Sequence, residues 1–126
     1  MRRYRNPAYR GDVSGFSQEY GRLPGTIVVS AEGDNPLCGD TLRIALSVSD
    51  SGSRTIEKAC YEGYGCSLCM AAAEVLLESL KGKSVEACLA VTADELLSRL
   101  GNIAVGRTRM KCVELPLAVL RKALCA

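Results

Sequence analysis

The hydrophobic pattern changes its period once along the chain, and this change limits the folds that the chain can adopt. Apolar residues alternate with smaller or polar ones over residues 42–48, as in a strand with one buried face. After Gly63 the apolar residues recur every three or four positions, as on one side of a helix; they are Met70, Ala73, Leu76, Leu77 and Leu80. Strands followed by helices predict an α+β domain in which helices pack on one face of a small sheet.

Two further segments complete the predicted sheet. "TIVVSAE", which starts at Thr26, is typical of a short strand. On the other side of the alternating segment, "DSGS" (residues 50–53) predicts a turn, and "RTIEKACYEG" (residues 54–63) returns as the partner strand. Three consecutive strands joined in this way predict an antiparallel meander.

The second half of the chain contains helix signals. A helix is predicted over Ser67–Leu80, and Ser84 can cap a short one. Thr92, with Glu95 three residues later, forms the pattern of a capping box, and Gly101 ends that helix. A loop is expected to about residue 109. The last helix is expected to start at Val113 or at Pro116, because proline is tolerated in the first turn of a helix.

Length and composition exclude several classes of protein. The chain has 126 residues, which fits one domain over residues 25–126 preceded by an irregular arm over residues 1–24. Sixteen basic and fourteen acidic residues leave a net charge of +2, too small to indicate nucleic-acid binding. We find no apolar run long enough for a membrane span and no signal-peptide pattern, so a cytoplasmic location is expected.

Seven cysteines and no histidine narrow the possible chemistry. In a cytoplasmic protein, that many cysteines indicate metal or sulfur chemistry rather than a disulfide framework. The absence of histidine excludes Ser-His-Asp and Cys-His catalysis, and also zinc sites that need imidazole. Any metal must therefore be bound mainly by cysteine and carboxylate side chains.

Three cysteines lie at predicted element boundaries. Cys38 in "NPLCGD" follows a turn and precedes a strand, while Cys66 in "GYGCSLC" and Cys112 in "RMKC" each precede a predicted helix. A helix N-terminus stabilises a thiolate, which is the form that attacks electrophiles and binds metals. One such cysteine is more simply a small buried hydrophobe, but three at boundaries favour a shared site.

The motifs "NPLCGD", "GYGCSLCMAAAE", "KGKS" and "RMKC" occur in this order, and together they resemble the U-type iron–sulfur cluster scaffold family. This family comprises IscU, SufU and the N-terminal domain of NifU. The resemblance covers most of the chain and implies a three-stranded antiparallel sheet with packed helices. It also implies a ligand set of Cys38, Asp40, Cys66 and Cys112. Lys111 stands where relatives have histidine or lysine, and the resemblance places it beside the site.

The resemblance implies a scaffold that is not an enzyme. Its cargo would be a [2Fe-2S] cluster, built from ferrous iron and from the sulfur of a cysteine desulfurase and passed to apo iron–sulfur proteins. A homo-oligomer around the cluster stays open, and no nucleic-acid or membrane partner is implied. The alternatives are a zinc-containing, SufU-like sulfurtransferase that accepts persulfide, with Zn²⁺ in the same site, and a structural zinc module without a transfer role.

Individual residues refine this hypothesis. A carboxylate in place of a fourth thiolate suits a scaffold that must release its cluster, and this is the expected role of Asp40. Cys69 departs from the family pattern; as an auxiliary residue near the site it could be a spare ligand, a sulfur acceptor or an apolar filler. The segment read by chaperones in IscU is replaced here by "VGRTRMK". Cys88 is expected in the core and Cys60 on an exposed strand face.

Overall fold

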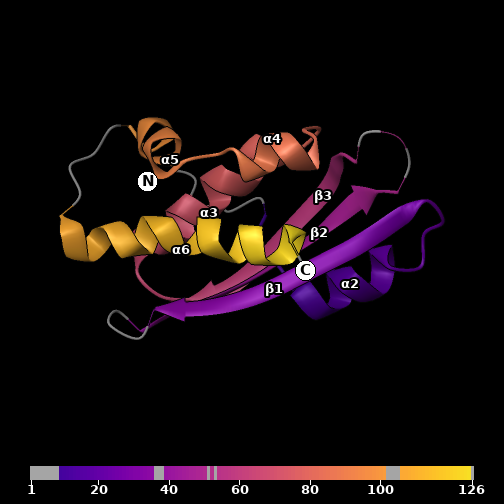
Figure 1. Ribbon diagram of the computed structural model, residues 1–126. Coiled ribbons are helices and arrows are strands. Elements are labelled where there is room, and N and C mark those ends of the chain that lie inside the picture. Colours follow the sequence, from indigo (N-terminus) through magenta and orange to yellow (C-terminus); the bar gives the residue numbers. More distant parts are fainter. Residues whose placement is uncertain (1–8, 36–38, 51, 53, 102–105, 126) are drawn as a thin grey trace.

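The computed structural model describes residues 9–35, 39–50, 52, 54–101 and 106–125, without the side chains of residues 107–109. Three antiparallel strands form one sheet in the order β1-β2-β3. Helices α3 and α6 cover one face of this sheet, and α2 lies against the other (Figure 1). The elements are α2 (Val13–Tyr20), β1 (Thr26–Asn35), β2 (Asp40–Ser49), β3 (Ile56–Tyr64), α3 (Ser67–Leu80), α4 (Val85–Leu89), α5 (Ala93–Arg99) and α6 (Arg107–Leu124).

The predicted α+β class and the three-stranded meander are confirmed. The central strand carries the alternating residues Leu42, Ile44, Leu46 and Val48, which are all buried beneath the helices. Each such side chain contributes about 1.5–3 kcal/mol when it is fully removed from water. The helix α3 has the predicted bounds, and nearly every one of its residues is buried. The core therefore lies between the sheet and the layer formed by α3 and α6.

A glycine allows α6 to lie close to β1. A Cβ atom at Gly33 would meet Val119 Cγ2 at 2.9 Å and Leu115 Cδ1 at 3.4 Å, so a larger residue would push the helix away from the strand. Near the C-terminal end of α6, Lys122 Nζ donates a hydrogen bond to the Glu32 carbonyl at 2.9 Å. These contacts fix the position of α6, and with it the position of Cys112.

The predicted N-caps of the two short helices, α4 and α5, are each confirmed by one hydrogen bond to the capping side chain. The Ser84 hydroxyl accepts a hydrogen bond from the Ala87 N–H at 3.2 Å, and Thr92 accepts one from the Glu95 N–H at 3.3 Å. These side chains satisfy backbone donors that have no partner inside their helices.

The expectation of an irregular segment over residues 1–24 is wrong for residues 13–20, which form α2. Asp12 caps this helix by accepting the Ser14 N–H at 3.1 Å. Val13 and Phe16 pack against Ala45 and Cys60 on the side of the sheet opposite to α3 and α6. The expectation of an exposed Cys60 is therefore also wrong, because α2 covers it. The division of the chain at residue 24 stays a prediction.

The last helix starts earlier than the sequence predicts. It begins at Arg107, so the expected loop to residue 109 and the start at Val113 or Pro116 are both wrong. Pro116 lies in the interior of α6. Proline has no N–H, and its ring crowds the carbonyl four residues earlier. In α6 that carbonyl belongs to Cys112, which is a predicted site residue.

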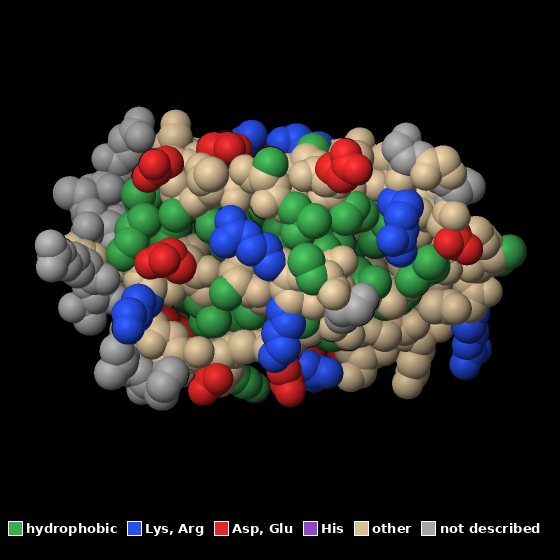
Figure 2. Space-filling view, in the orientation of Figure 1, with side chains coloured by type: hydrophobic (Ala, Val, Ile, Leu, Met, Phe, Trp, Pro, Cys, Tyr) green, Lys and Arg blue, Asp and Glu red, His purple; other side chains and the backbone are tan. Residues whose placement is uncertain are grey.

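No helix in the described part of the chain is long and apolar enough to cross a membrane. On the face that carries α6, basic and acidic side chains are interspersed with hydrophobic ones, and neither charge gathers into a patch (Figure 2). This distribution agrees with the small net charge of +2.

Candidate metal centre

Asp40 occupies the first position of the central strand and is fully buried, with 0% of its surface exposed. The preceding residue, Gly39, has a φ of 70°, a left-handed conformation that glycine adopts without a steric penalty. The turn therefore delivers the Asp40 side chain to the face of the sheet that also carries Leu42 and Ile44. A buried carboxylate is costly unless hydrogen-bond donors surround it, and two donors contact this one.

The first donor belongs to the start of α3. Cys66 is the N-cap of this helix, and its backbone N–H donates to Asp40 Oδ1 at 2.8 Å. A Cβ atom at Gly65 would approach the Asp40 carboxylate, with its Cγ at 2.9 Å and its Cβ at 3.0 Å. Glycine at position 65 therefore leaves the space that the carboxylate fills. The Cys66 sulfur in turn accepts the Cys69 N–H at 3.4 Å, as the predicted helix N-terminus requires.

The second donor belongs to α6. Cys112 Sγ donates a hydrogen bond to Asp40 Oδ2 at 3.2 Å, although 72 positions separate the two residues. Cys112 is buried and lies in the second turn of α6. The predicted location of Cys112 at a helix N-terminus is therefore wrong, and the helix-dipole argument applies to Cys66 alone. Packing of α6 on β1, rather than a helix end, brings Cys112 to the carboxylate.

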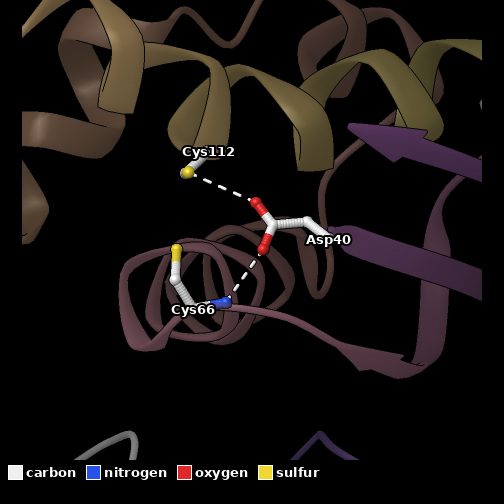
Figure 3. Close-up of side chains that lie close together, drawn as sticks. All are labelled: Asp40, Cys66 and Cys112. Carbon is white, nitrogen blue, oxygen red and sulfur yellow. Dashed lines mark hydrogen bonds between the residues drawn. The ribbon is translucent and has the colours of Figure 1, made fainter. Parts of the chain in front are cut away.

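The three side chains converge on one point, where both sulfur atoms and the carboxylate face one another (Figure 3). One ligand atom from each of Asp40, Cys66 and Cys112 lies within 4.8 Å of the others. Zinc binds sulfur at about 2.3 Å and carboxylate oxygen at about 2.0–2.2 Å, and iron–sulfur clusters are held by thiolates. Small side-chain rotations would bring these three atoms to one metal ion, so the donor set fits either kind of cargo.

The remaining predicted site residues differ in their placement. Cys38 lies outside the described residues, so its part in the site stays a prediction. Lys111 is exposed and lines a hollow of about 360 Å³ with Asn35 and Leu115. Cys69 is fully buried and belongs to the main hydrophobic core. Its placement agrees with the apolar-filler alternative, and its auxiliary role stays a prediction.

Two further thiols illustrate a different environment. Burial, followed by the nearby acids Glu62 and Asp12, raises the pKa of Cys60 to about 11. Burial also raises the pKa of Cys88, whose predicted core position is confirmed. At neutral pH both are therefore protonated, and a protonated thiol is a poor nucleophile and a poor metal ligand. Neither belongs to the group of potential ligands that converges at Asp40.

Three further residues shape this region, and none of them was predicted from the sequence to have a role in the site. Gly65 makes room for the carboxylate, and Pro116 alters the helix next to Cys112. Asn35 is buried at the end of β1, opposite Asp40 in the strand register. A signal for Asn35 was present, because it continues the period-two pattern of Ala31 and Gly33 towards the helix layer.

Comparison with known proteins adds independent information. A model of the NifU-like N terminal domain family matches residues 1–126. The chain is 32% identical over 90 residues to "Iron-sulfur cluster assembly scaffold protein IscU 1" of Archaeoglobus fulgidus, covering 71% of this chain and 56% of that protein. It is 32% identical over 92 residues to "Zinc-dependent sulfurtransferase SufU" of Bacillus subtilis, covering 73% and 52%. The chain thus spans little more than half the length of these relatives.

A solved structure shows the same fold. It is the crystal structure of the "Putative iron-sulfur cluster assembly scaffold protein for SUF system" from Fervidobacterium islandicum. The match has a TM-score of 0.61 at 22% sequence identity, and it covers 86% of this chain and 93% of that one. At this identity the likeness concerns the fold, and it supports the arrangement of three strands and packed helices described above.

Proposed function

The chain belongs to the NifU-like N-terminal domain family, and we propose that it is a scaffold for iron–sulfur cluster assembly. In this role it builds a [2Fe-2S] cluster from ferrous iron and desulfurase-derived sulfur, and transfers it to apo iron–sulfur proteins. The observation that carries the proposal is the convergence of Asp40, Cys66 and Cys112 on one point from three separate elements. The chain then carries cargo rather than turning over a substrate, so it is not an enzyme.

The donor set explains how such a site both holds and releases its cargo. Thiolates bind iron–sulfur clusters firmly, while a carboxylate is a harder and more exchangeable ligand. The Cys66 N–H anchors Asp40 Oδ1 at 2.8 Å, which leaves Oδ2 turned towards Cys112. Loading requires the Cys112 thiol to lose its proton, because ligand thiols bind as thiolates. Asp40 then exchanges a hydrogen bond from Cys112 for contact with the cargo.

Residues around this centre complete the proposed site. Cys38 supplies the third thiolate of the ligand set in this proposal. Lys111 is exposed and precedes Cys112 on α6, so its ammonium group can offset the negative charge of a thiolate-rich centre. The partners in this proposal are a cysteine desulfurase and apoprotein acceptors, and a second copy of the chain can share the cluster.

A zinc-dependent sulfurtransferase is the second candidate. The specific observation in its favour is the 32% identity to a relative with that name. Two thiolates and a carboxylate also suit Zn²⁺. In this alternative Zn²⁺ occupies the centre, and Cys66 or Cys112 accepts persulfide from the desulfurase.

Anaerobic purification separates these two functions. We expect the scaffold to contain iron and acid-labile sulfide after incubation with ferrous iron, cysteine, a desulfurase and a thiol reductant that converts persulfide sulfur to sulfide. Visible absorption from a [2Fe-2S] cluster should accompany them. Cys66→Ser and Cys112→Ser should lose this absorption, while Cys88→Ser, whose thiol lies elsewhere in the core, should keep it. Stoichiometric zinc without iron, together with persulfide on the chain, would instead identify the sulfurtransferase.

Asp40→Ala tests the proposed labile ligand. We expect this variant to assemble a cluster and to transfer it to an acceptor apoprotein more slowly than the parent, because three thiolates would then dominate the binding. The transfer is measured as the rate at which the acceptor gains its own cluster absorption. A variant that transfers its cluster as fast as the parent would remove this role from Asp40.

Metal removal tests whether the centre is only structural. The hydrophobic core runs along the sheet and includes residues at the end of β2 opposite to Asp40, such as Val48 and its strand partner Ile56. We therefore expect a chelator to strip the metal while the far-ultraviolet circular dichroism spectrum stays folded. Unfolding on chelation, combined with a desulfurase whose activity is indifferent to the protein, would identify a structural zinc module.

A further inference from the structure

The Asn35 side chain is buried without a hydrogen-bond partner for its amide nitrogen. Only 7% of the residue is exposed, and Nδ2 is the one buried side-chain nitrogen or oxygen without a partner in the part of the chain that the structure describes. Buried polar groups are nearly always satisfied in folded proteins, and leaving one unpaired is costly. We therefore expect the Asn35 amide to find its hydrogen-bond acceptor when a ligand binds nearby.

Asn35 lies beside the candidate metal centre. It is the last residue of β1 and pairs directly with Asp40 in the antiparallel register. Directly opposite residues project from the same face of a sheet, with Cβ atoms about 4.5–5.5 Å apart. Asn35 and Asp40 therefore project from the same face of the sheet, the face covered by α3 and α6.

The amide nitrogen is also turned away from solvent. Asn35 contributes to the wall of the 360 Å³ hollow, whose other side is formed by residues of α6 that include Lys111 and Leu115. Although the residue borders this hollow, Nδ2 itself is buried. This unpaired donor is thus shielded from water, on the side of the sheet that carries the centre.

Once the two thiols are deprotonated, the side chains of Asp40, Cys66 and Cys112 offer acceptors and no donor. We propose that Asn35 is a positioning residue whose Nδ2 donates a hydrogen bond to an anionic sulfur at the Asp40–Cys66–Cys112 centre. That sulfur is a ligand thiolate or, resting on the proposed scaffold function, a sulfide of the cargo.

Such a bond has two consequences. A donor next to a metal ligand orients that ligand and stabilises its charge, and removal of donors of this kind typically weakens metal affinity about tenfold to a hundredfold. Hydrogen bonds to cluster sulfurs also help to set the reduction potential. The protein accepts an unpaired amide in the metal-free state because loading satisfies it.

The test uses Co²⁺ as the probe, because its thiolate charge-transfer band reports on the sulfur ligands. Reduced metal-free protein is titrated with Co²⁺ for the parent, Asn35→Leu and Asn35→Asp. The leucine variant has a similar volume without polar atoms, and the aspartate variant keeps the shape but loses the donor. Asp34→Ala is the matched control, because Asp34 is the adjacent exposed residue on the other face of β1.

We expect both Asn35 variants to bind Co²⁺ about tenfold to a hundredfold more weakly than the parent. Their charge-transfer band should move to lower energy, because a thiolate without the hydrogen bond holds its electrons less tightly. The metal-free Asn35→Leu protein should melt at the same temperature as the parent or at a higher one, because it no longer buries an unpaired amide. Asp34→Ala should match the parent in all three measurements.

Two results would overturn the assignment. One is parental Co²⁺ affinity and band energy in both Asn35 variants. The other is a lower melting temperature of metal-free Asn35→Leu with an unchanged band energy, which would make Asn35 a purely structural residue. Failure of the scaffold function is visible separately, because the parent would then bind Co²⁺ at this centre but assemble no cluster with iron, cysteine and desulfurase.

Discussion

Helices α3 and α6 each bring one cysteine to Asp40, but they position it in different ways. Cys66 stands at the N-cap of α3, where its own backbone N–H binds the carboxylate. Cys112 lies inside α6 and reaches the carboxylate through its thiol. Cys66 thus contacts the carboxylate through its main chain, and Cys112 contacts it through its thiol. Of the two, Cys112 should be the ligand more easily moved.

The residues near each cysteine also indicate that Cys66 is held more firmly than Cys112. Gly65 precedes Cys66 and leaves room for the carboxylate. Pro116 follows Cys112 by one helical turn, and it deprives α6 of the hydrogen bond from residue 116 to the Cys112 carbonyl. The start of α3 is therefore packed closely against Asp40. In contrast, α6 is weakened around Cys112 by the missing backbone hydrogen bond. Three substitutions test this difference.

Gly65→Ala should have the largest effect. The added Cβ would overlap the Asp40 carboxylate, and such overpacking typically costs about 1–3 kcal/mol. Displacement of Asp40 should also weaken Co²⁺ binding about tenfold or more, as loss of an orienting contact does. Calorimetric melting and Co²⁺ titration measure the two effects.

The matched control for Gly65→Ala is Gly106→Ala. Gly106 is the N-cap of α6, and a Cβ there would have nothing within 4 Å. We expect it to cost no more than about 1 kcal/mol, the usual size of an N-cap effect, and to leave Co²⁺ affinity unchanged. If both variants behaved alike, the two helix starts would be equivalent and the contrast between them would fail.

Pro116→Ala should have an intermediate effect of the opposite sign. Alanine restores the N–H that can bond to the Cys112 carbonyl, so the free energy of unfolding should rise by about 1–3 kcal/mol. Straightening the helix should also move the thiol relative to Asp40 and lower Co²⁺ affinity. Urea unfolding of the metal-free protein measures the gain. Pro24→Ala, in the turn before β1, serves as the control, and it should lose about 0.4–1 kcal/mol.

A Pro116→Ala variant that is no more stable than the parent would mean that α6 has already adapted to its proline. Its packing against β1 through Leu115 and Val119 would then outweigh the missing hydrogen bond. In that case the position of Cys112 depends on the strand contact alone.

The same contrast explains how much of the fold could be predicted from the sequence. The strand at Leu42–Val48 and the helix α3 follow from hydrophobic periodicity, because each buries one regular face. The start of α6 could not be predicted in this way, because Gly106 and the charged residues after it are typical of a loop. Its first turns form because the later part of the helix is fixed on β1 by contacts such as the one at Gly33.

The site shows the same limit more strongly. The gaps between Asp40, Cys66 and Cys112 match no compact ligand motif, so local spacing could not predict that their side chains meet. Three cysteines at predicted element boundaries favoured a shared site, and the family resemblance implied its ligand set. The ligand roles stay predictions. The burial of Asn35 depends on strand register and on the packing of α6, which no short motif encodes.

Cys69 should give the smallest effect and the sharpest test of the comparison. Like Cys112 it is a buried thiol on a helix of this layer. Both thiols belong to the same hydrophobic core, but their partners differ. Cys112 donates to the Asp40 carboxylate, whereas Cys69 lies near Tyr61. We therefore expect Cys69→Ala to cost about 1 kcal/mol, as a small core truncation does, and to bind Co²⁺ like the parent. Cys112→Ala should lose that binding.

Alkylation of the folded, reduced protein supplies the second readout for Cys69. A thiol with no exposed surface reacts slowly whatever its neighbours, because the reagent must wait for the helix to open. Cys66 is partly exposed at the start of α3 and should be labelled before Cys69, with mass spectrometry locating each adduct. Labelling of Cys69 as fast as Cys66 would place its thiol at the centre, as the auxiliary role requires. In that case burial on α3 or α6 would not distinguish a core cysteine from a site cysteine. Only the contact with Asp40 would distinguish them.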